Sequence, residues 1–221
     1  MIWTKRRLLV AVAMSDTLTS KQFYELFMRL EEDMSLNETF VLGDLKYSLP
    51  EETNKWIESM DWDLEIKRLQ EEKVKVITIL DGAYPQRLKE IYLPPIVLFY
   101  RGNLSLLNQR AVAIVGSRDH SKYAKDCIHE LIPSLVKDDI VIISGLARGV
   151  DTLAHEESLK ANGNTIAVIG SGLDVVYPPE NSKLYDVIAK KGLILSEYPL
   201  QSRPLKFHFP YRNRIIAGLS H

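Results

Sequence analysis

Cysteine is nearly absent from this sequence, since Cys127 is the single cysteine among 221 residues. An internal disulfide needs two cysteines and a multi-cysteine zinc site needs more, so one chain can build neither. This cysteine usage is typical of the reducing cytoplasm, which we expect as the compartment.

Long apolar runs are lacking as well. No stretch approaches the roughly 18 consecutive apolar residues that cross a bilayer. Three basic residues precede the apolar run from Leu8 to Met14, as in a signal peptide, but this run is short and no convincing cleavage site follows it. We interpret it as part of a helix.

Acidic residues are missing from the C-terminal end. Residues 1–100 hold 13 Lys and Arg against 17 Asp and Glu, whereas residues 101–221 hold 15 against 12, and no acidic residue follows Glu197. The segment SRPLKFHFPYRNRIIAG (202–218) interleaves cations with aromatic rings. A solvated loop would explain the charges and core packing would explain the rings. Charges and rings together favour a binding site for single-stranded nucleic acid, because cations contact phosphates and rings stack on bases.

Composition and periodicity divide the chain near residue 100. Residues 1–72 carry apolar residues at helical spacing and predict a small helical domain. Residues 73–105 predict a connecting extended segment that leads into a sheet. Residues 106–221 form the main domain.

The main domain alternates strands and helices. Apolar runs at 111–115, 140–144, 165–169 and 193–196 are separated by amphipathic segments. Because these runs are continuously apolar, we expect strands buried on both faces, in a parallel sheet with flanking helices. The sequence therefore predicts an α/β protein with a Rossmann-like sheet.

Three glycine turns follow the first three of these strands, in AIVGSR (113–118), VIISGLARGVD (141–151) and IAVIGSGLD (166–174). In such sheets the carboxyl ends of the strands and the helix N-termini form the ligand site. The turns lack both G-x-G-x-x-G and a Walker loop, so dinucleotide or ATP binding is weakly supported. We predict backbone phosphate binding, reinforced by Arg118 and Arg148. The four glycines of this prediction are Gly116, Gly145, Gly149 and Gly170, and tight packing alone could also explain them.

Other polar residues near these turns allow two interpretations. His155 follows Asp151 by one helical turn and could be a general base, although a structural Asp–His pair is the preferred interpretation. Serines occur in all three turns, but none lies in a nucleophile elbow, which favours a role in turn structure. Their positions are Ser117, Ser144 and Ser171. Glu197 is expected to form a salt bridge with Arg212 or Arg214.

Six motifs together resemble the DNA-processing protein A family (DprA, also called Smf). They occur in the family's order over residues 75–221: LPPIVLFYRGN, AIVGSR, SGLARGVDTLAH, GNTIAVIGSGLDVVYPPEN, GLILSEYP and FPYRNRIIAGLS. Residues 1–72 resemble the small sterile-alpha-motif-like (SAM-like) domain that precedes the Rossmann-like domain in many members.

The resemblance implies a protein without enzymatic activity, cofactor or metal site. Family members bind and protect incoming single-stranded DNA during natural transformation, help to load a RecA-type recombinase, and act as homodimers. Carried over to matching positions, Arg118 and Lys206 would contact phosphates, with Ser117 beside Arg118, and Phe209 would stack a base. Four further matching positions are assigned supporting roles: Arg148, Arg212, Asn213 and Arg214.

The sequence departs from the family pattern at its end. After IIAGLSH the family typically continues with further strands, so we expect the C-terminal part of the sheet to be missing and dimerisation to be affected. Two other functions stay open. One is a nucleotide phosphoribohydrolase-like enzyme, whose P-G-G-x-G-T signature is lacking, and the other is a non-functional truncated remnant.

Overall fold

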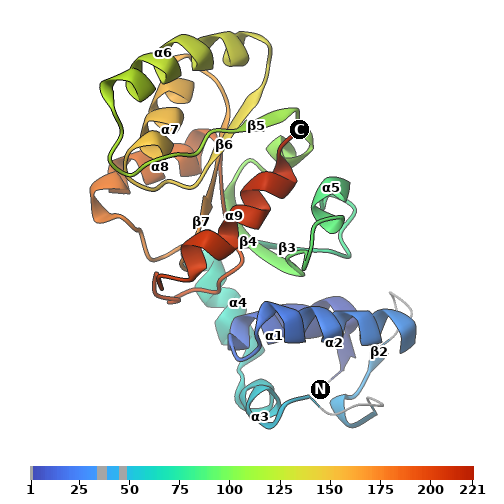
Figure 1. Ribbon diagram of the computed structural model, residues 1–221. Coiled ribbons are helices and arrows are strands. Elements are labelled where there is room, and N and C mark those ends of the chain that lie inside the picture. The colour runs from blue at the N-terminus through green and yellow to red at the C-terminus, as the bar shows by residue number, and fades with distance from the viewer. Residues whose placement is uncertain (1, 34–38, 45–48) are drawn as a thin grey trace.

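The computed structural model describes residues 2–33, 39–44 and 49–221 (Figure 1). Residues 1, 34–38 and 45–48, which belong to the predicted helical domain, lie outside the described residues.

The N-terminal region is mainly helical. It contains α1 (Lys5–Ser15), α2 (Ser20–Asp33), α3 (Glu51–Ser59) and α4 (Trp62–Glu71), and a two-residue strand β1 (Trp3–Thr4) pairs antiparallel with β2 (Thr39–Phe40). A short 3-10 helix, η1, covers Leu42–Asp44. Side-chain caps fix where two of the helices begin: the Thr4 hydroxyl accepts the backbone N–H of Arg7, and the Asp61 carboxylate accepts those of Asp63 and Leu64.

A six-stranded mixed sheet forms the centre of the molecule, in the order β3-β4-β8-β7-β6-β5. The strands are β3 (Lys75–Thr78), β4 (Val97–Gly102), β5 (Ala111–Ala113), β6 (Val141–Ser144), β7 (Thr165–Ile169) and β8 (Leu193–Ser196). Strands β5 to β8 are parallel, which confirms the predicted Rossmann-like α/β fold.

The extended segment 73–105 supplies two strands to this same sheet. β3 pairs antiparallel with β4, and β4 pairs antiparallel with β8, so that Phe99 lies opposite Ser196. Val97, Leu98 and Phe99 are fully buried, which explains why this strand lies inside the sheet rather than on the surface. The domain limits at 72 and 105 stay a prediction.

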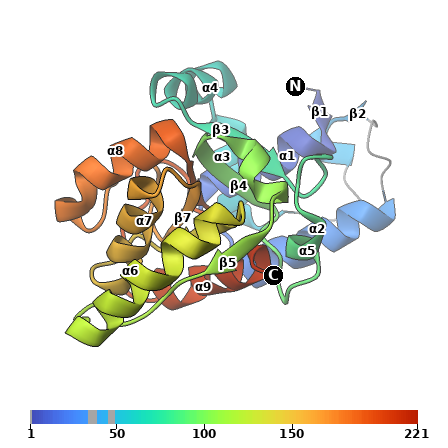
Figure 2. The same ribbon diagram turned by 90° about the horizontal axis from the view of Figure 1, so that it is seen from above.

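Helices cover both faces of the sheet (Figure 2). α6 (Lys122–Lys137), α7 (Val150–Lys160) and α8 (Ser182–Lys191) lie together on one face, while α9 (His208–Leu219) and the short α5 (Gln86–Lys89) lie on the other. Two short 3-10 helices, η2 (Leu104–Asn108) and η3 (Pro179–Asn181), connect other elements. α9 crosses β7, β6 and β5, so that the backbone N–H of His221 donates to the carbonyl of Ala111 at the start of β5.

One apolar core joins the helical region to the sheet. It includes Leu8 and Leu9 of α1, Ile77 of β3 and Ile215 of α9, all buried. A smaller cluster fills the space between α6, α7 and Ile142 of β6. No helix in the described ranges is both long enough and apolar enough to traverse a lipid bilayer.

Candidate functional site

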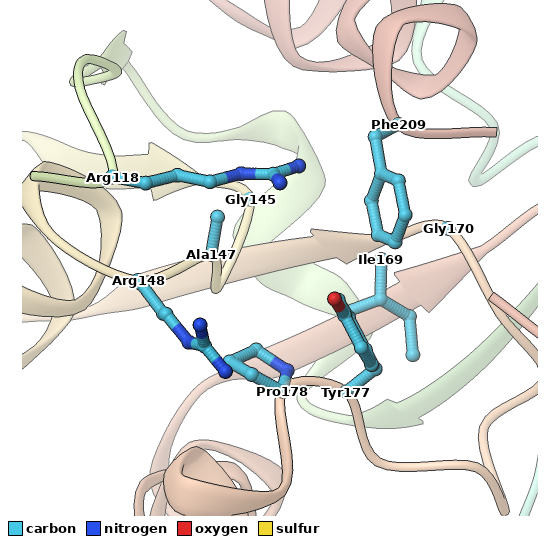
Figure 3. Close-up of a pocket in the computed structure, with 9 residues that line it drawn as sticks. All are labelled: Arg118, Gly145, Ala147, Arg148, Ile169, Gly170, Tyr177, Pro178 and Phe209. Atoms are coloured by element: carbon cyan, nitrogen blue, oxygen red, sulfur yellow. The ribbon is translucent and has the colours of Figure 1, made fainter. Parts of the chain in front are cut away.

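A small pocket of about 30 Å³ opens at the carboxyl ends of β6 and β7 (Figure 3). Turns after β5, β6 and β7 meet here with the start of α9, as expected for a Rossmann-like sheet. The lining residues are Arg118, Gly145, Ala147, Arg148, Ile169, Gly170, Tyr177, Pro178 and Phe209. The pocket therefore unites residues that are separated by up to 91 positions in the chain, from Arg118 to Phe209.

A cation faces an aromatic ring across this pocket. Arg118 reaches from the turn after β5 toward Phe209, and its guanidinium carbon lies 5.5 Å from the centre of that ring (Figure 3). The Tyr177 ring packs on Phe209 with 5.3 Å between centroids. Arg118 is exposed and has no carboxylate within 4.0 Å in the described part of the chain, so its charge is available to an anion.

Lys206 lies just before α9 and is exposed, but it does not line the pocket. It precedes Phe209 by three residues, within the acid-free segment after Glu197. Among described residues it, too, has no carboxylate within 4.0 Å. Lys206 and Arg118 are thus two exposed cations without a carboxylate partner, one three residues before Phe209 in the sequence and the other facing its ring.

The glycines of the turns are close-packed. Gly149 has φ +78°, and a Cβ there would lie 2.2 Å from the carbonyl oxygen of Ser117. A Cβ on Gly145 would overlap the guanidinium of Arg212, and one on Gly116 would meet Val150. Close packing accounts for these three positions, and a role in cradling phosphate stays a prediction for them and for Gly170, which packs on His208.

Arg212 points inward from α9. Its guanidinium donates to the carbonyl of Gly145 at 2.6 Å and to that of Val168, and it lies 3.7 Å from the Asp151 carboxylate. The residue is only 4% exposed. Burial lowers the pKa of Arg212 to about 10, which leaves it charged at neutral pH, and Asp151 acts in the opposite direction. Arg212 therefore fastens α9 to the ends of β6 and β7, beneath the pocket.

The other residues assigned supporting roles have partners of their own. Arg214 donates two hydrogen bonds to Glu197, at 2.6 and 2.8 Å, which resolves the two alternatives left open by the sequence. Arg148 pairs with Glu180 at the surface and lines the pocket. Asn213 is exposed and accepts a hydrogen bond from Nε of Arg212.

Asp151 and His155 do not pair. The Asp151 carboxylate, in the first turn of α7, instead accepts the backbone N–H groups of Gly145 and Ala147 in the preceding loop. Burial raises the pKa of Asp151, and Arg212 opposes that shift. His155 Nδ1 lies 2.7 Å from the Thr165 hydroxyl, and burial lowers the pKa of His155 to about 3. A fully buried, neutral imidazole bonded to a core threonine is placed to support packing rather than to take protons from a ligand.

The three turn serines bond to the backbone. The hydroxyls of Ser117, Ser144 and Ser171 donate to the carbonyls of Asp119, Ile114 and Val175, at 2.8, 2.6 and 2.8 Å. This agrees with a role in turn structure. Within the ranges that the structure describes, no group of three or more His, Cys, Asp and Glu side chains is placed to hold a metal ion.

Sequence reasoning missed Tyr177 and Pro178, which close the lower side of the pocket (Figure 3). Both belong to the loop that leaves the carboxyl end of β7, seven and eight residues after Gly170. The sequence did offer a signal for Tyr177, because an aromatic residue in a loop at the carboxyl edge of such a sheet is often part of a binding site.

The fold and the pocket define a Rossmann-like α/β protein whose site presents cations and an aromatic ring. The family model described as DNA recombination-mediator protein A matches residues 75–221, and the chain belongs to this family.

Relatives of this family share extensive sequence with the chain. DNA processing protein DprA of Streptococcus pneumoniae is 53% identical over 148 residues, 67% of this chain and 52% of the relative. The Bacillus subtilis DprA is 45% identical over 152 residues, 68% of this chain and 51% of the relative. The chain thus spans about half the length of these curated relatives.

Solved structures agree with this assignment. The X-ray structure of DprA from S. pneumoniae has a TM-score of 0.81 at 41% identity, over 96% of this chain and 74% of that one. DprA from Helicobacter pylori, whose structure is described as showing a unique single-stranded DNA binding mode, has a TM-score of 0.59 at 37% identity, over 67% and 66% of the two chains.

Proposed function

We propose that this protein binds single-stranded DNA at the carboxyl edge of its sheet. The observation that carries the proposal is the exposed, unpaired Arg118 facing Phe209, with the unpaired Lys206 three residues before that ring. Cations at this spacing neutralise phosphates while a ring stacks on a base, which is the chemistry of sequence-indifferent single-strand binding. The single-strand binding described for the H. pylori relative supports the same assignment.

In the cell, we propose a mediator role. The protein protects incoming single strands in natural transformation and helps to load a RecA-type recombinase onto them in the cytoplasm. Membership of the DNA recombination-mediator protein A family supports this role. It is a binding role that requires no catalysis.

The alternative enzymatic function has weaker support in the geometry. A phosphoribohydrolase-like mechanism would need His155 or Glu197 as an accessible acid or base. His155 is fully buried beside Thr165, and Glu197 is paired with Arg214. Neither residue lines the pocket.

Fluorescence anisotropy with labelled oligo-dT, compared with duplex of equal length at several salt concentrations, tests the proposed function. We expect preferential binding of the single strand that weakens as salt increases. Arg118→Ala and Lys206→Ala should each reduce the slope of log K against log salt by about 0.7. Phe209→Ala should lower the affinity by about 1–3 kcal/mol and leave that slope unchanged.

Lys190→Ala removes an exposed cation from α8, on the helical face away from α9, and is the matched control. It should leave both affinity and slope unchanged. If all three site variants bind like the parent protein, the assignment of this edge as the DNA site is wrong.

A further inference from the structure

A second, larger hollow lies beside the pocket of Arg118 and Phe209. Its volume is about 540 Å³, which is within the range of about 300–1,000 Å³ that is usual for small-molecule sites. One wall is the turn between α1 and α2, and the other is the segment that leads into α9, which Figure 1 shows on the side of the sheet nearest the N-terminal helices. We call it the junction hollow.

The α9 side of the junction hollow is aromatic. Phe207 lines it and is 65% exposed, an unusual position for a phenylalanine in a folded protein. Next to it the rings of Tyr198 and His208 stack with 3.8 Å between centroids and 18° between planes. Tyr211 completes this wall. The packed neighbours hold Phe207 in place, and its exposed ring can stack on a flat aromatic ligand.

The start of α9 lies between the junction hollow and the first pocket, which share no lining residue. Phe207 lines the hollow, Phe209 lines the pocket, and His208 lies between them. The Nδ1 atom of His208 lies 3.0 Å from the carbonyl oxygen of Gly170, a residue that lines the first pocket. The fixed side chain of His208 therefore lies between the junction hollow and the first pocket.

The charges of the junction hollow favour a polyanion that carries flat bases. Arg203 and Lys21 are both exposed lining residues, although Lys21 also lies 4.0 Å from Glu25 on its own helix. Asp16 is the one carboxylate among the described lining residues, and it accepts a hydrogen bond from the Ser202 hydroxyl at 3.1 Å. Burial lowers the pKa of His208, which disfavours a positive charge on this buried ring.

We propose that the junction hollow is a second base-binding subsite, which takes a nucleobase of the same single strand that occupies the first pocket. Phe207 stacks that base and Arg203 contacts an adjoining phosphate. This inference rests on the proposed function. It goes beyond it because the hollow is built jointly by the N-terminal helical region and the sheet, so both regions contact the strand.

Oligonucleotides of two lengths separate the two subsites. Oligo-dT of about 4 and of about 16 nucleotides covers the usual range of site sizes for single-strand grooves. Phe207→Ala and Arg203→Ala should weaken binding of the longer oligonucleotide about fivefold to hundredfold, and of the shorter one much less. Phe209→Ala should weaken both. Phe207→Tyr, which keeps a ring, should retain most of the affinity.

Control variants and the possible outcomes distinguish this inference from the proposed function. Leu131→Ala on α6 removes an exposed apolar side chain, and Lys190→Ala removes an exposed cation, and neither should alter binding at either length. If the parent protein binds no single strand, the proposed function itself fails. If the parent binds and Phe209→Ala weakens it, while Phe207→Ala and Arg203→Ala match the parent at both lengths, the second subsite does not exist.

As an independent readout, ultraviolet crosslinking of an iodouracil-containing oligonucleotide should give adducts at Phe207 or Tyr211. Adducts confined to Phe209 and Tyr177 would overturn the inference even if affinities change.

Discussion

At the scale of single residues, the imidazole of His155 shows how burial fixes a protonation state. The side chain is 0% exposed, and its Nδ1 is engaged by Thr165. Burial is the main cause that lowers the pKa of His155 to about 3, with the nearby Arg212 charge as a second cause. The ordinary value in an unfolded chain is about 6.5.

This difference makes stability depend on pH. Between about pH 3 and 6.5 the unfolded chain binds a proton at His155 that the folded chain does not, so protonation favours unfolding. The free energy of unfolding should therefore decrease as the pH falls from 6.5 toward 4, by up to about 1.4 kcal/mol per pH unit from this group. Urea titrations at several pH values measure it.

His155→Gln removes the titration and should flatten this dependence. The comparison is of slopes, so a general loss of stability in the variant does not affect it. Equal slopes in parent and variant would show that His155 titrates alike in both states.

At the scale of elements, Arg212 holds α9 against the ends of β6 and β7. Its charge is buried against two carbonyl oxygens and faces Asp151. Removal of one partner of a buried pair leaves the other charge without compensation and usually costs about 3–5 kcal/mol. Because α9 also carries Phe209, loss of the Arg212 contacts should disturb the pocket of Arg118 and Phe209 as well.

Arg212→Met should accordingly lower the free energy of unfolding by about 3–5 kcal/mol. Lys190→Ala, at an exposed position of α8, should change it by no more than about 0.5 kcal/mol. Urea denaturation at pH 7 measures both. A loss for Arg212→Met as small as that of the control would mean that the buried guanidinium contributes little to the docking of α9.

The sequence predicted some elements well for physical reasons. The apolar runs at 140–144, 165–169 and 193–196 match the fully buried strands β6, β7 and β8, because a strand that is buried on both faces leaves that signature. The run at 111–115 is longer than β5, an edge strand that ends at Ala113 and is only partly buried. The pairing of β4 with β8 was not predictable, since it joins residues that are almost 100 positions apart and depends on tertiary packing alone. Arg118 and Phe209 were predicted to act together, and the structure brings them to one pocket.

The directions of the α9 arginines could not be predicted from composition. Positions two apart on a helix differ by about 200° around its axis, so Arg212 and Arg214 must point to different sides. Only the packed structure shows that Arg212 faces the sheet edge and Arg214 faces Glu197. A run of cations in a sequence does not distinguish a buried structural arginine from an exposed ligand-binding one.

At the scale of the whole molecule, one core spans the helical region and the sheet. Leu8 and Leu9 of α1 pack in the same cluster as Ile77 of β3 and Phe99 of β4. Across this junction Arg6 donates to the Asp81 carboxylate at 2.9 and 3.2 Å. Shared burial of this kind favours cooperative unfolding of both regions.

The positions of the tryptophans allow a direct test of this cooperative unfolding. All three, Trp3, Trp56 and Trp62, lie in the N-terminal region, so their fluorescence reports on that region, whereas far-UV circular dichroism reports on every helix and strand. Urea transitions followed by the two signals should coincide. A fluorescence transition at lower urea would show that residues 1–72 unfold as a separate domain.

The late position of α9 in the sequence also determines when the pocket can form during synthesis. Phe209 and Arg212 belong to α9, which follows β8 in the sequence, and one lines the pocket while the other reaches the carbonyls of Gly145 and Val168. A ribosome that has released the chain only as far as β8 exposes the glycine turns without the ring that faces Arg118. Since chains fold as they emerge, the pocket should remain incomplete until α9 docks. The order of synthesis thereby delays completion of the pocket until strands β3 to β8 have all been made.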